Sequence, residues 1–147
     1  MVNNDTRIVS VYHTLLPAEP LTVVVADSTI PAGFPSPAGD DRESLDIGAH
    51  IVRRPSSTFF MRVAGDSMTG AGIFDGDLIV VDRSLAPHHG NIVVAVVNGE
   101  FTVKRLCLAN GRTELQPENS KYRKILVSGE MEFEIWGVVT GAYKEFR

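Results

Sequence analysis

The chain lacks the features that mark secreted, disulfide-stabilised and membrane proteins. It has one cysteine among 147 residues, Cys107, so an intramolecular disulfide is impossible. A single thiol in a strand-like run is typical of a small core residue in a reducing compartment. The longest apolar runs, residues 78–81 and 92–97, are too short to cross a bilayer. The first ten residues lack the basic start and apolar stretch of a secretory signal. We therefore expect a cytoplasmic protein that does not enter membranes.

An excess of positive charge is also missing. The chain has 14 Lys and Arg against 18 Asp and Glu, which gives a net charge of -4 and a pI near 5.5. Such a chain has no overall positive field that would draw it onto DNA phosphates. We expect no direct specific DNA binding, and any nucleic-acid role would come through a partner. The 44% hydrophobic and 22% charged content is that of an ordinary globular domain.

Proline separates an N-terminal arm from the rest of the chain. Five of the eight prolines fall between Pro17 and Pro37. Proline removes amide donors and disfavours helix at the preceding residue, so segments 7–13 and 21–27 could form only short, interrupted strands. Residues 1–45 are predicted to be an extended arm and linker. A compact helix-turn-helix has no room to form there.

Residues 46–147 are predicted to form a mainly β domain. Strand-like runs rich in valine, isoleucine and aromatics recur between short turns, at residues 58–65, 77–83, 91–97, 100–108, 112–118, 124–128 and 134–144. Asn98-Gly99 suits the positive backbone angles of a two-residue hairpin turn. Only short helices are expected, around residues 46–54 and 67–72.

The stretch VAGDSMTGAGIFDGDLIVVD, residues 63–82, places Ser67 in a glycine-rich turn before a strand. A serine hydroxyl is a poor nucleophile until a base removes its proton. The chain has four histidines, and none has the setting of a Ser-His-Asp triad: His13, His50, His88 and His89. Ser67 is therefore either a turn residue or a nucleophile that uses another base.

Lys104 is the candidate base that remains after the histidines. It lies within the strand-like run EFTVKRLCL, where alternation places Lys104 on one face with Thr102, Leu106 and Leu108. On an edge strand such a lysine would extend its ammonium group to water and discourage aggregation. Buried, it would lose part of its affinity for the proton and could act as a general base. The strand alone leaves both interpretations open.

A buried Lys104 would complete a Ser-Lys dyad. Ser67 would attack a carbonyl carbon, and Lys104 would take the serine proton and later pass it to the leaving amine. Backbone amides of the turn, at Asp66 and Ser67, would stabilise the oxyanion.

Several ordered motifs resemble the LexA/UmuD family of self-cleaving serine peptidases, and the UmuD branch most closely. They are GDSM, GIFDGDLIVVD, HGNIVVAVVNGEFTVKRL and FEIWGVV, and the resemblance runs from residue 32 to the C-terminus. It implies that Ser67 is the nucleophile and Lys104 the general base. The family cuts between a small residue and a glycine in the linker, which implies cleavage at Ala32-Gly33. We expect no cofactor and no metal.

The resemblance also implies a biological role. Cleavage would be triggered by a RecA filament on single-stranded DNA during the SOS response. The trimmed homodimer would join a UmuC-type polymerase in error-prone translesion synthesis.

Because no helix-turn-helix is expected before the linker, a LexA-like repressor fragment is disfavoured. A signal peptidase is disfavoured because no membrane anchor is present. A non-catalytic polymerase-binding module with a silent dyad remains the main alternative, and cleavage in cis or in trans is equally compatible.

Two other features favour structural roles. Asp75 and Asp77 in FDGD are expected to cap backbone amides of a turn and not to bind a metal. Phe133 and Trp136 in FEIWGVV are expected in the core or in a dimer interface.

Overall fold

The computed structural model describes residues 4–13, 22–26 and 42–146. The predicted cleavage site, Ala32-Gly33, lies outside these residues. The chain divides into a larger unit, residues 1–14 and 54–147, and a smaller unit, residues 15–53. In chain order the elements are β1 (Arg7–His13), β2 (Thr22–Ala26), β3 (Arg42–Asp46), α1 (Ile47–Ile51), the 3-10 turn η1 (Pro55–Ser57), β4 (Thr58–Ala64), the 3-10 turn η2 (Thr69–Ala71), β5 (Leu78–Asp82), β6 (Ile92–Val97), β7 (Glu100–Ala109), β8 (Arg112–Gln116), β9 (Ile125–Leu126) and β10 (Phe133–Tyr143).

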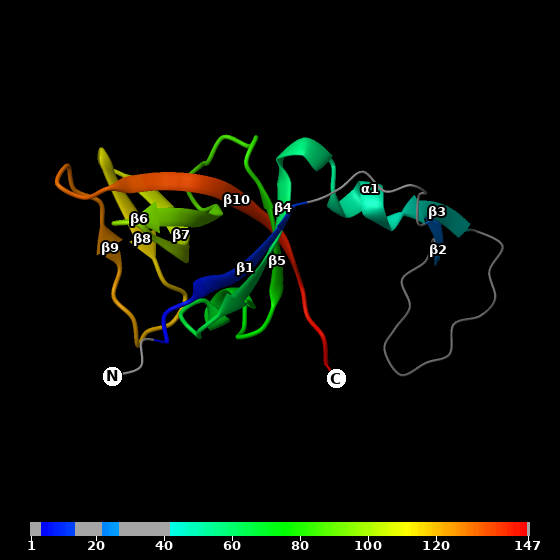
Figure 1. The fold of residues 1–147 in the computed structure, drawn as a ribbon, viewed down its shortest axis with the longest axis horizontal. Helices are drawn as coiled ribbons and strands as arrows, with labels where there is room; N and C mark the ends of the chain where they lie inside the picture. Colours follow the sequence, from blue (N-terminus) through cyan, green and yellow to red (C-terminus); the bar gives the residue numbers. More distant parts are fainter. Residues whose placement is uncertain (1–3, 14–21, 27–41, 147) are drawn as a thin grey trace. The chain divides into compact units, whose positions relative to one another are not determined.

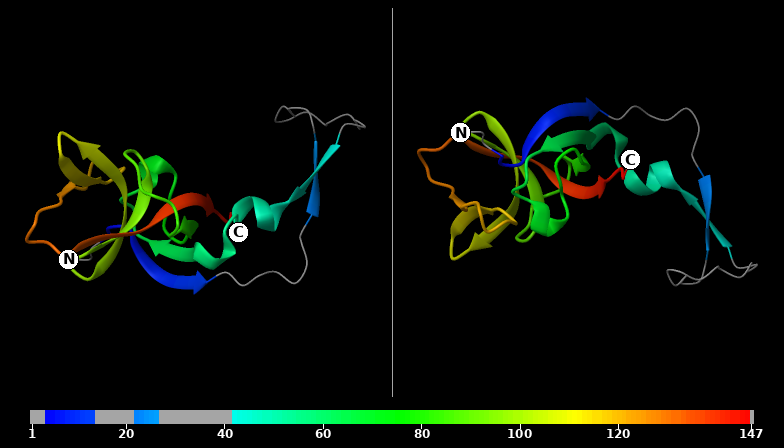
Figure 2. Two further views of the ribbon diagram at one scale, coloured as in Figure 1. Left: turned by 90° about the horizontal axis from the view of Figure 1, so that it is seen from above. Right: turned by 90° about the horizontal axis from the view of Figure 1, so that it is seen from below.

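The larger unit is one curled sheet of eight strands in the order β1-β4-β5-β10-β6-β7-β8-β9, and each neighbouring pair is antiparallel. Figure 1 shows how strongly the sheet twists, and the two views of Figure 2 both show β1 alongside β4. The first strand of the chain therefore forms an edge of the sheet. The prediction of a mainly β fold is confirmed.

Tight turns join the middle strands. Asn98 and Gly99, with φ of 49° and 81°, link β6 to β7. Asn110 and Gly111, with φ of 53° and 73°, link β7 to β8 in the same way. Positive φ at both central residues matches the right-handed twist of the paired strands, and Asn-Gly tolerates it best. The predicted hairpin is confirmed, and so are the short helices near residues 46–54 and 67–72.

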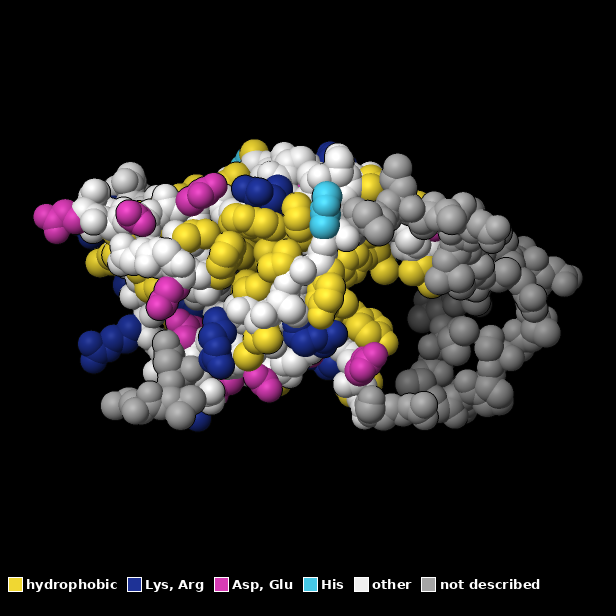
Figure 3. All heavy atoms as spheres, viewed as in Figure 1, with side chains coloured by type: hydrophobic (Ala, Val, Ile, Leu, Met, Phe, Trp, Pro, Cys, Tyr) yellow, Lys and Arg dark blue, Asp and Glu magenta, His cyan; other side chains and the backbone are white. Residues whose placement is uncertain are grey.

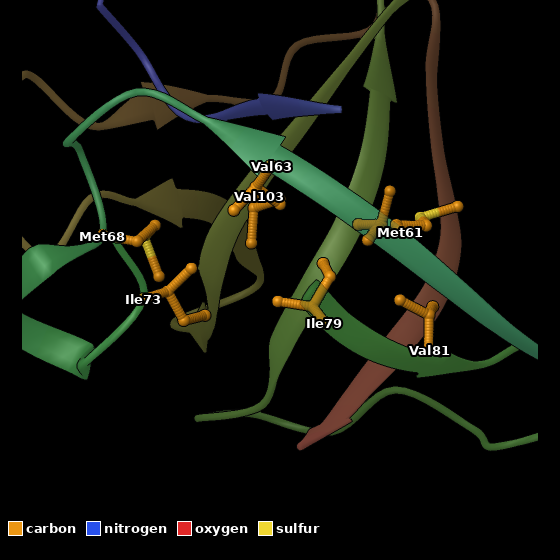
Figure 4. Close-up of a cluster of buried hydrophobic side chains, with 8 residues drawn as sticks. Met61, Val63, Met68, Ile73, Ile79, Val81 and Val103 are labelled. Carbon is orange, nitrogen blue, oxygen red and sulfur yellow. The ribbon is translucent and has the colours of Figure 1, made fainter. Parts of the chain in front are cut away.

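Two apolar clusters fill the interior of this sheet. The first joins strands β4, β5, β6 and β7 to the turn after β4, and its buried members are Met61, Val63, Met68, Ile73, Ile79, Val81, Val94 and Val103. Figure 4 shows Val63 against Val103, and Met68 beside Ile73. The second cluster comprises Val93, Ala95, Leu106, Leu115 and Val138. Removing this apolar surface from water fixes the turn that carries Ser67 against β7.

Asp75 and Asp77 cap backbone amides, as predicted. Asp75 accepts a hydrogen bond from the Gly65 amide at 2.9 Å, and Asp77 accepts one from the Phe74 amide at 2.8 Å. Trp136 packs against the first cluster, and Phe133 packs against the second. Figure 3 shows apolar side chains gathered over the middle of one face of the larger unit, with charged side chains around them.

In the smaller unit, β2 pairs with β3, and β3 leads into α1. The Asp46 carboxylate caps this helix by accepting a hydrogen bond from the Ala49 amide at 3.0 Å. Among the residues that the structure describes, no helix has the length and apolar character needed to cross a bilayer.

Candidate active site

Strand β4 ends at Ala64, and Ser67 follows three residues later. The Ser67 side chain is fully buried. The chain leaves the strand at Gly65, whose φ of +104° is one that L side chains rarely adopt. The 3-10 turn η2 begins two residues after Ser67. The hydroxyl therefore sits on a short, tightly bent connection whose neighbours Val63 and Met68 are held in the core.

Lys104 lies near the middle of β7, directly opposite Val93 on β6. Because β7 pairs with β6 on one side and β8 on the other, it is not an edge strand. The Lys104 side chain is 1% exposed. The interpretation of Lys104 as an edge-strand lysine in water is therefore wrong.

The two side chains meet inside the larger unit. Lys104 Nζ lies 3.2 Å from Ser67 Oγ. The same nitrogen lies 2.8 Å from Thr102 Oγ1, 3.1 Å from the Val103 carbonyl oxygen and 2.5 Å from Asp5 Oδ1. An amine and a hydroxyl at this separation can exchange a proton directly. Sequence reasoning named both residues, but it gave no indication of Asp5.

The protonation of Lys104 is set by two opposing effects. Burial lowers the pKa of Lys104 below its ordinary value because the interior disfavours the ammonium form, whereas the hydrogen bond and charge of Asp5 raise it. Desolvation is the larger effect, so the pKa is lowered overall. The neutral amine, the form that can act as a base, is therefore more accessible than in an exposed lysine.

A polar loop between β8 and β9 holds the Ser67 turn from the other side. The Glu118 amide donates to the Ser67 carbonyl oxygen at 2.8 Å, and the Glu118 carbonyl accepts from the Gly70 amide at 2.7 Å. Gly70 is required for this approach, because a Cβ there would lie 2.6 Å from the Glu118 carbonyl oxygen. Asn119 Nδ2 donates to the Asp66 carbonyl oxygen at 2.8 Å.

Comparison with known proteins identifies the family of this chain. The Peptidase S24-like family model matches residues 23–140. The chain belongs to the S24 peptidase family. It is 50% identical to Protein MucA of Salmonella typhimurium over 113 aligned residues, and this aligned stretch covers 76% of this chain and 77% of MucA. It is 50% identical over 111 residues to Protein SamA of the same species, covering 75% and 76%.

A LexA repressor is a further relative. The LexA repressor of Syntrophotalea carbinolica is 40% identical over 119 residues, which is 81% of this chain and 58% of the repressor. Together these matches place this S24 chain in the LexA/UmuD family of self-cleaving serine peptidases, on its UmuD-like side. Membership of this kind supports a role related to SOS mutagenesis.

Two histidines of this S24 chain, His13 and His89, have other contacts. The His13 ring stacks on Phe59 with centroids 4.5 Å apart, and His89 Nδ1 accepts a hydrogen bond from the Leu108 amide. Within residues 4–13, 22–26 and 42–146, no group of three His, Cys, Asp or Glu side chains could hold a metal ion. Lysine is thus the basic side chain that the described structure places on Ser67.

Tyr122 offers a direct check on the loop contacts. Its hydroxyl donates a hydrogen bond to the Asp66 carboxylate, and this bond raises the pKa of Tyr122 to about 12. We expect Asp66→Asn to return the Tyr122 ionisation toward its ordinary value of about 10. Ultraviolet titration of phenolate, with Tyr122→Phe to assign the transition, measures this. An unchanged midpoint in Asp66→Asn would contradict the contact.

Proposed function

We propose that this chain is a peptidase that cuts its own linker at Ala32-Gly33 with Ser67 as nucleophile and Lys104 as general base. The observation that carries the proposal is the 3.2 Å separation between Lys104 Nζ and Ser67 Oγ in a buried setting. A buried lysine within hydrogen-bond distance of a serine hydroxyl can take its proton and so activate the serine without a histidine.

The reaction follows from the two groups. Neutral Lys104 accepts the Ser67 proton while Oγ bonds to the Ala32 carbonyl carbon. The proton then passes from Lys104 to the Gly33 nitrogen as the C–N bond breaks, which leaves an ester on Ser67. Water hydrolyses the ester, with Lys104 again accepting and returning the proton. Amides of the turn, at Asp66 and Ser67, are proposed to hold the oxyanion.

The choice of Ala32-Gly33 as the bond that is cut rests on the family resemblance and on the small size of alanine and glycine. The same segment contains a second Ala-Gly pair, Ala38-Gly39, and both pairs lie outside the described residues. The two cuts give fragments that begin at Gly33 or Gly39, so their masses differ by six residues. Any test of the proposal therefore needs the mass or the N-terminal sequence of the product.

The proposed role is that of a cytoplasmic SOS-response protein. A RecA filament on single-stranded DNA would stimulate cleavage by favouring the conformer in which linker and dyad meet. The trimmed homodimer would then act with a UmuC-type polymerase in translesion synthesis. The exposed apolar side chains of the edge strand β1, Val9, Val11 and Tyr12, offer one surface for dimer formation. In the alternative, the fold would bind the polymerase without cutting itself.

Stimulation by the filament tests the proposal. The purified chain is incubated at neutral pH with RecA, single-stranded DNA and a nucleotide, and the products are weighed by mass spectrometry. We expect a fragment beginning at Gly33, formed faster than with DNA alone or RecA alone. If neither the filament nor alkaline pH yields any fragment, the peptidase proposal fails.

A further inference from the structure

Residues 4–6, the N-terminal segment that precedes β1, lie directly on the candidate dyad. The Thr6 amide donates a hydrogen bond to Ser67 Oγ at 2.9 Å. Asp5 Oδ1 lies 2.5 Å from Lys104 Nζ. One short segment thus contacts both the serine hydroxyl and the lysine amine, and the Thr6 side chain is fully buried in doing so.

The backbone of the same segment is bound on both sides. The Asn4 carbonyl oxygen accepts a hydrogen bond from the Asp66 amide at 2.8 Å. The Thr6 carbonyl oxygen accepts from the Val103 amide at 3.3 Å and from Thr102 Oγ1 at 3.3 Å. The Asp66 amide is one of the donors assigned above to the oxyanion. Asn4 therefore occupies a group that a substrate carbonyl would need.

Strand β1 fixes the segment in this position. Its antiparallel register with β4 pairs Arg7 with Ala64, so the residues before Arg7 run past Gly65 and the turn that carries Ser67. A Cβ at Gly65 would lie 2.4 Å from the Asp5 carbonyl oxygen. The chain can approach the turn this closely because residue 65 has no side chain.

The charge on Asp5 also acts against catalysis. A carboxylate beside Lys104 favours the ammonium form, and an ammonium group cannot accept the serine proton. Within the described residues, Asp5 is the charged group that pairs with Lys104, while the Asp66 carboxylate on the Ser67 turn accepts a hydrogen bond from Tyr122. The segment therefore opposes both substrate entry and activation of Ser67.

The segment is separate from the part of the chain that the family shares. The family model begins at residue 23, and residues 4–6 lie before it and before the linker. We propose that residues 4–6 lie on the Ser67-Lys104 dyad as a pseudosubstrate and must leave before the linker can reach it. This inference rests on the proposed function, because the competition it describes is for the Ser67-Lys104 dyad.

The fit of Thr6 is imperfect in a way that allows release. Thr6 Oγ1 is buried, and the described part of the structure offers it no hydrogen-bond partner. An unpaired buried hydroxyl weakens binding of the segment, whereas a methyl group of the same shape would not. Thr6→Val should therefore hold the segment more tightly, while Asp5→Asn should loosen it by removing the charge that pairs with Lys104.

Two readouts on the full-length chain test the proposal. The first is hydrogen exchange, by NMR, of the Thr6 and Asp66 amides in the uncut protein. The second is the rate of appearance of the Gly33 fragment at mildly alkaline pH. We expect slow exchange at both amides in the native chain.

Asp5→Asn should speed cleavage by about tenfold or more, the effect of losing a hydrogen bond to a charged group, and Thr6→Val should slow it. Glu130→Gln, an exposed carboxylate in the turn before β10, is the matched control and should change neither readout.

Each outcome decides the matter. Slow exchange, with faster cleavage in Asp5→Asn and slower cleavage in Thr6→Val, supports the pseudosubstrate. Unprotected amides overturn it whatever the cleavage rate. Cleavage that is unchanged or slower in Asp5→Asn, or unchanged or faster in Thr6→Val, also overturns it. A new N-terminus at Asp5 or Thr6 would make the segment a substrate and also overturn it. If no variant is cut under any condition, the proposed function fails, whereas slow exchange would still support the contact of residues 4–6 with the dyad.

Discussion

Replacing Lys104 with methionine is expected to slow self-cleavage by at least about a thousandfold, the scale on which removing one member of a catalytic group acts. Methionine fills nearly the same volume but offers no lone pair on nitrogen, so the Ser67 proton has no acceptor. Ser67→Ala should have an equally large effect because it removes the nucleophile. The measurement is the yield of fragment over time, by mass spectrometry at alkaline pH.

Two controls make this result specific. Lys121→Met and Ser128→Ala alter exposed residues of the same types and should cleave as the native chain does. Because Lys104 is buried and bonded to Asp5, each dyad variant is also checked for folding by thermal unfolding. A folded Lys104→Met chain that is cut at the native rate would show that Lys104 is not the base.

Raising the pH is expected to speed cleavage of the pure chain by about tenfold per pH unit until Lys104 is mostly neutral. The pKa of Lys104 is lowered by burial, so the rate should level off below the ordinary lysine value of about 10.4. Rates measured across this range in the native chain give the midpoint. In Asp5→Asn the midpoint should move to lower pH, because the group that raises the pKa of Lys104 is gone.

This acceleration is separable from alkaline unfolding. The folded-state pKa of Lys104 lies below its unfolded value, so the unfolded chain binds more protons and the contribution of Lys104 to stability rises with pH. That contribution is complete above about pH 10.4 and is lost as the pH falls through the lower folded value. As the pH rises through the range in which cleavage speeds up, the titration of Lys104 therefore does not destabilise the folded state. If the cleavage rate rises with the unfolding of the chain, and not with the titration of Lys104, the assignment of Lys104 as the base is contradicted.

Local sequence signals were enough to predict most of the fold. Short runs of β-branched residues predicted strands β4 to β10, whereas residues 7–13 were assigned to the arm and not to this sheet. Asn98-Gly99 predicted a hairpin because its backbone angles depend on two residues alone. Alternation also placed Lys104 on a face of β7. It could not decide whether that strand was inside the sheet or at its edge, because strand order depends on pairing between distant segments.

The candidate site was predicted in part for the same reason. Ser67 and Lys104 were found from their setting and from the family motifs. Asp5 and Thr6 were missed, because their contacts with the dyad span 99 and 61 positions of sequence and follow no local pattern. The loop around Asn119 was missed as well. Its polar residues indicate only a surface turn until the structure places it on Asp66.

The central claim is that Ser67 and Lys104 cut the chain's own linker. The most direct test is the accurate mass of the product formed by the pure native chain at alkaline pH, measured beside Ser67→Ala. The account predicts a fragment of residues 33–147 from the native chain and none from Ser67→Ala. Formation of the same fragment by both chains, or an intact native chain after prolonged incubation, would contradict it.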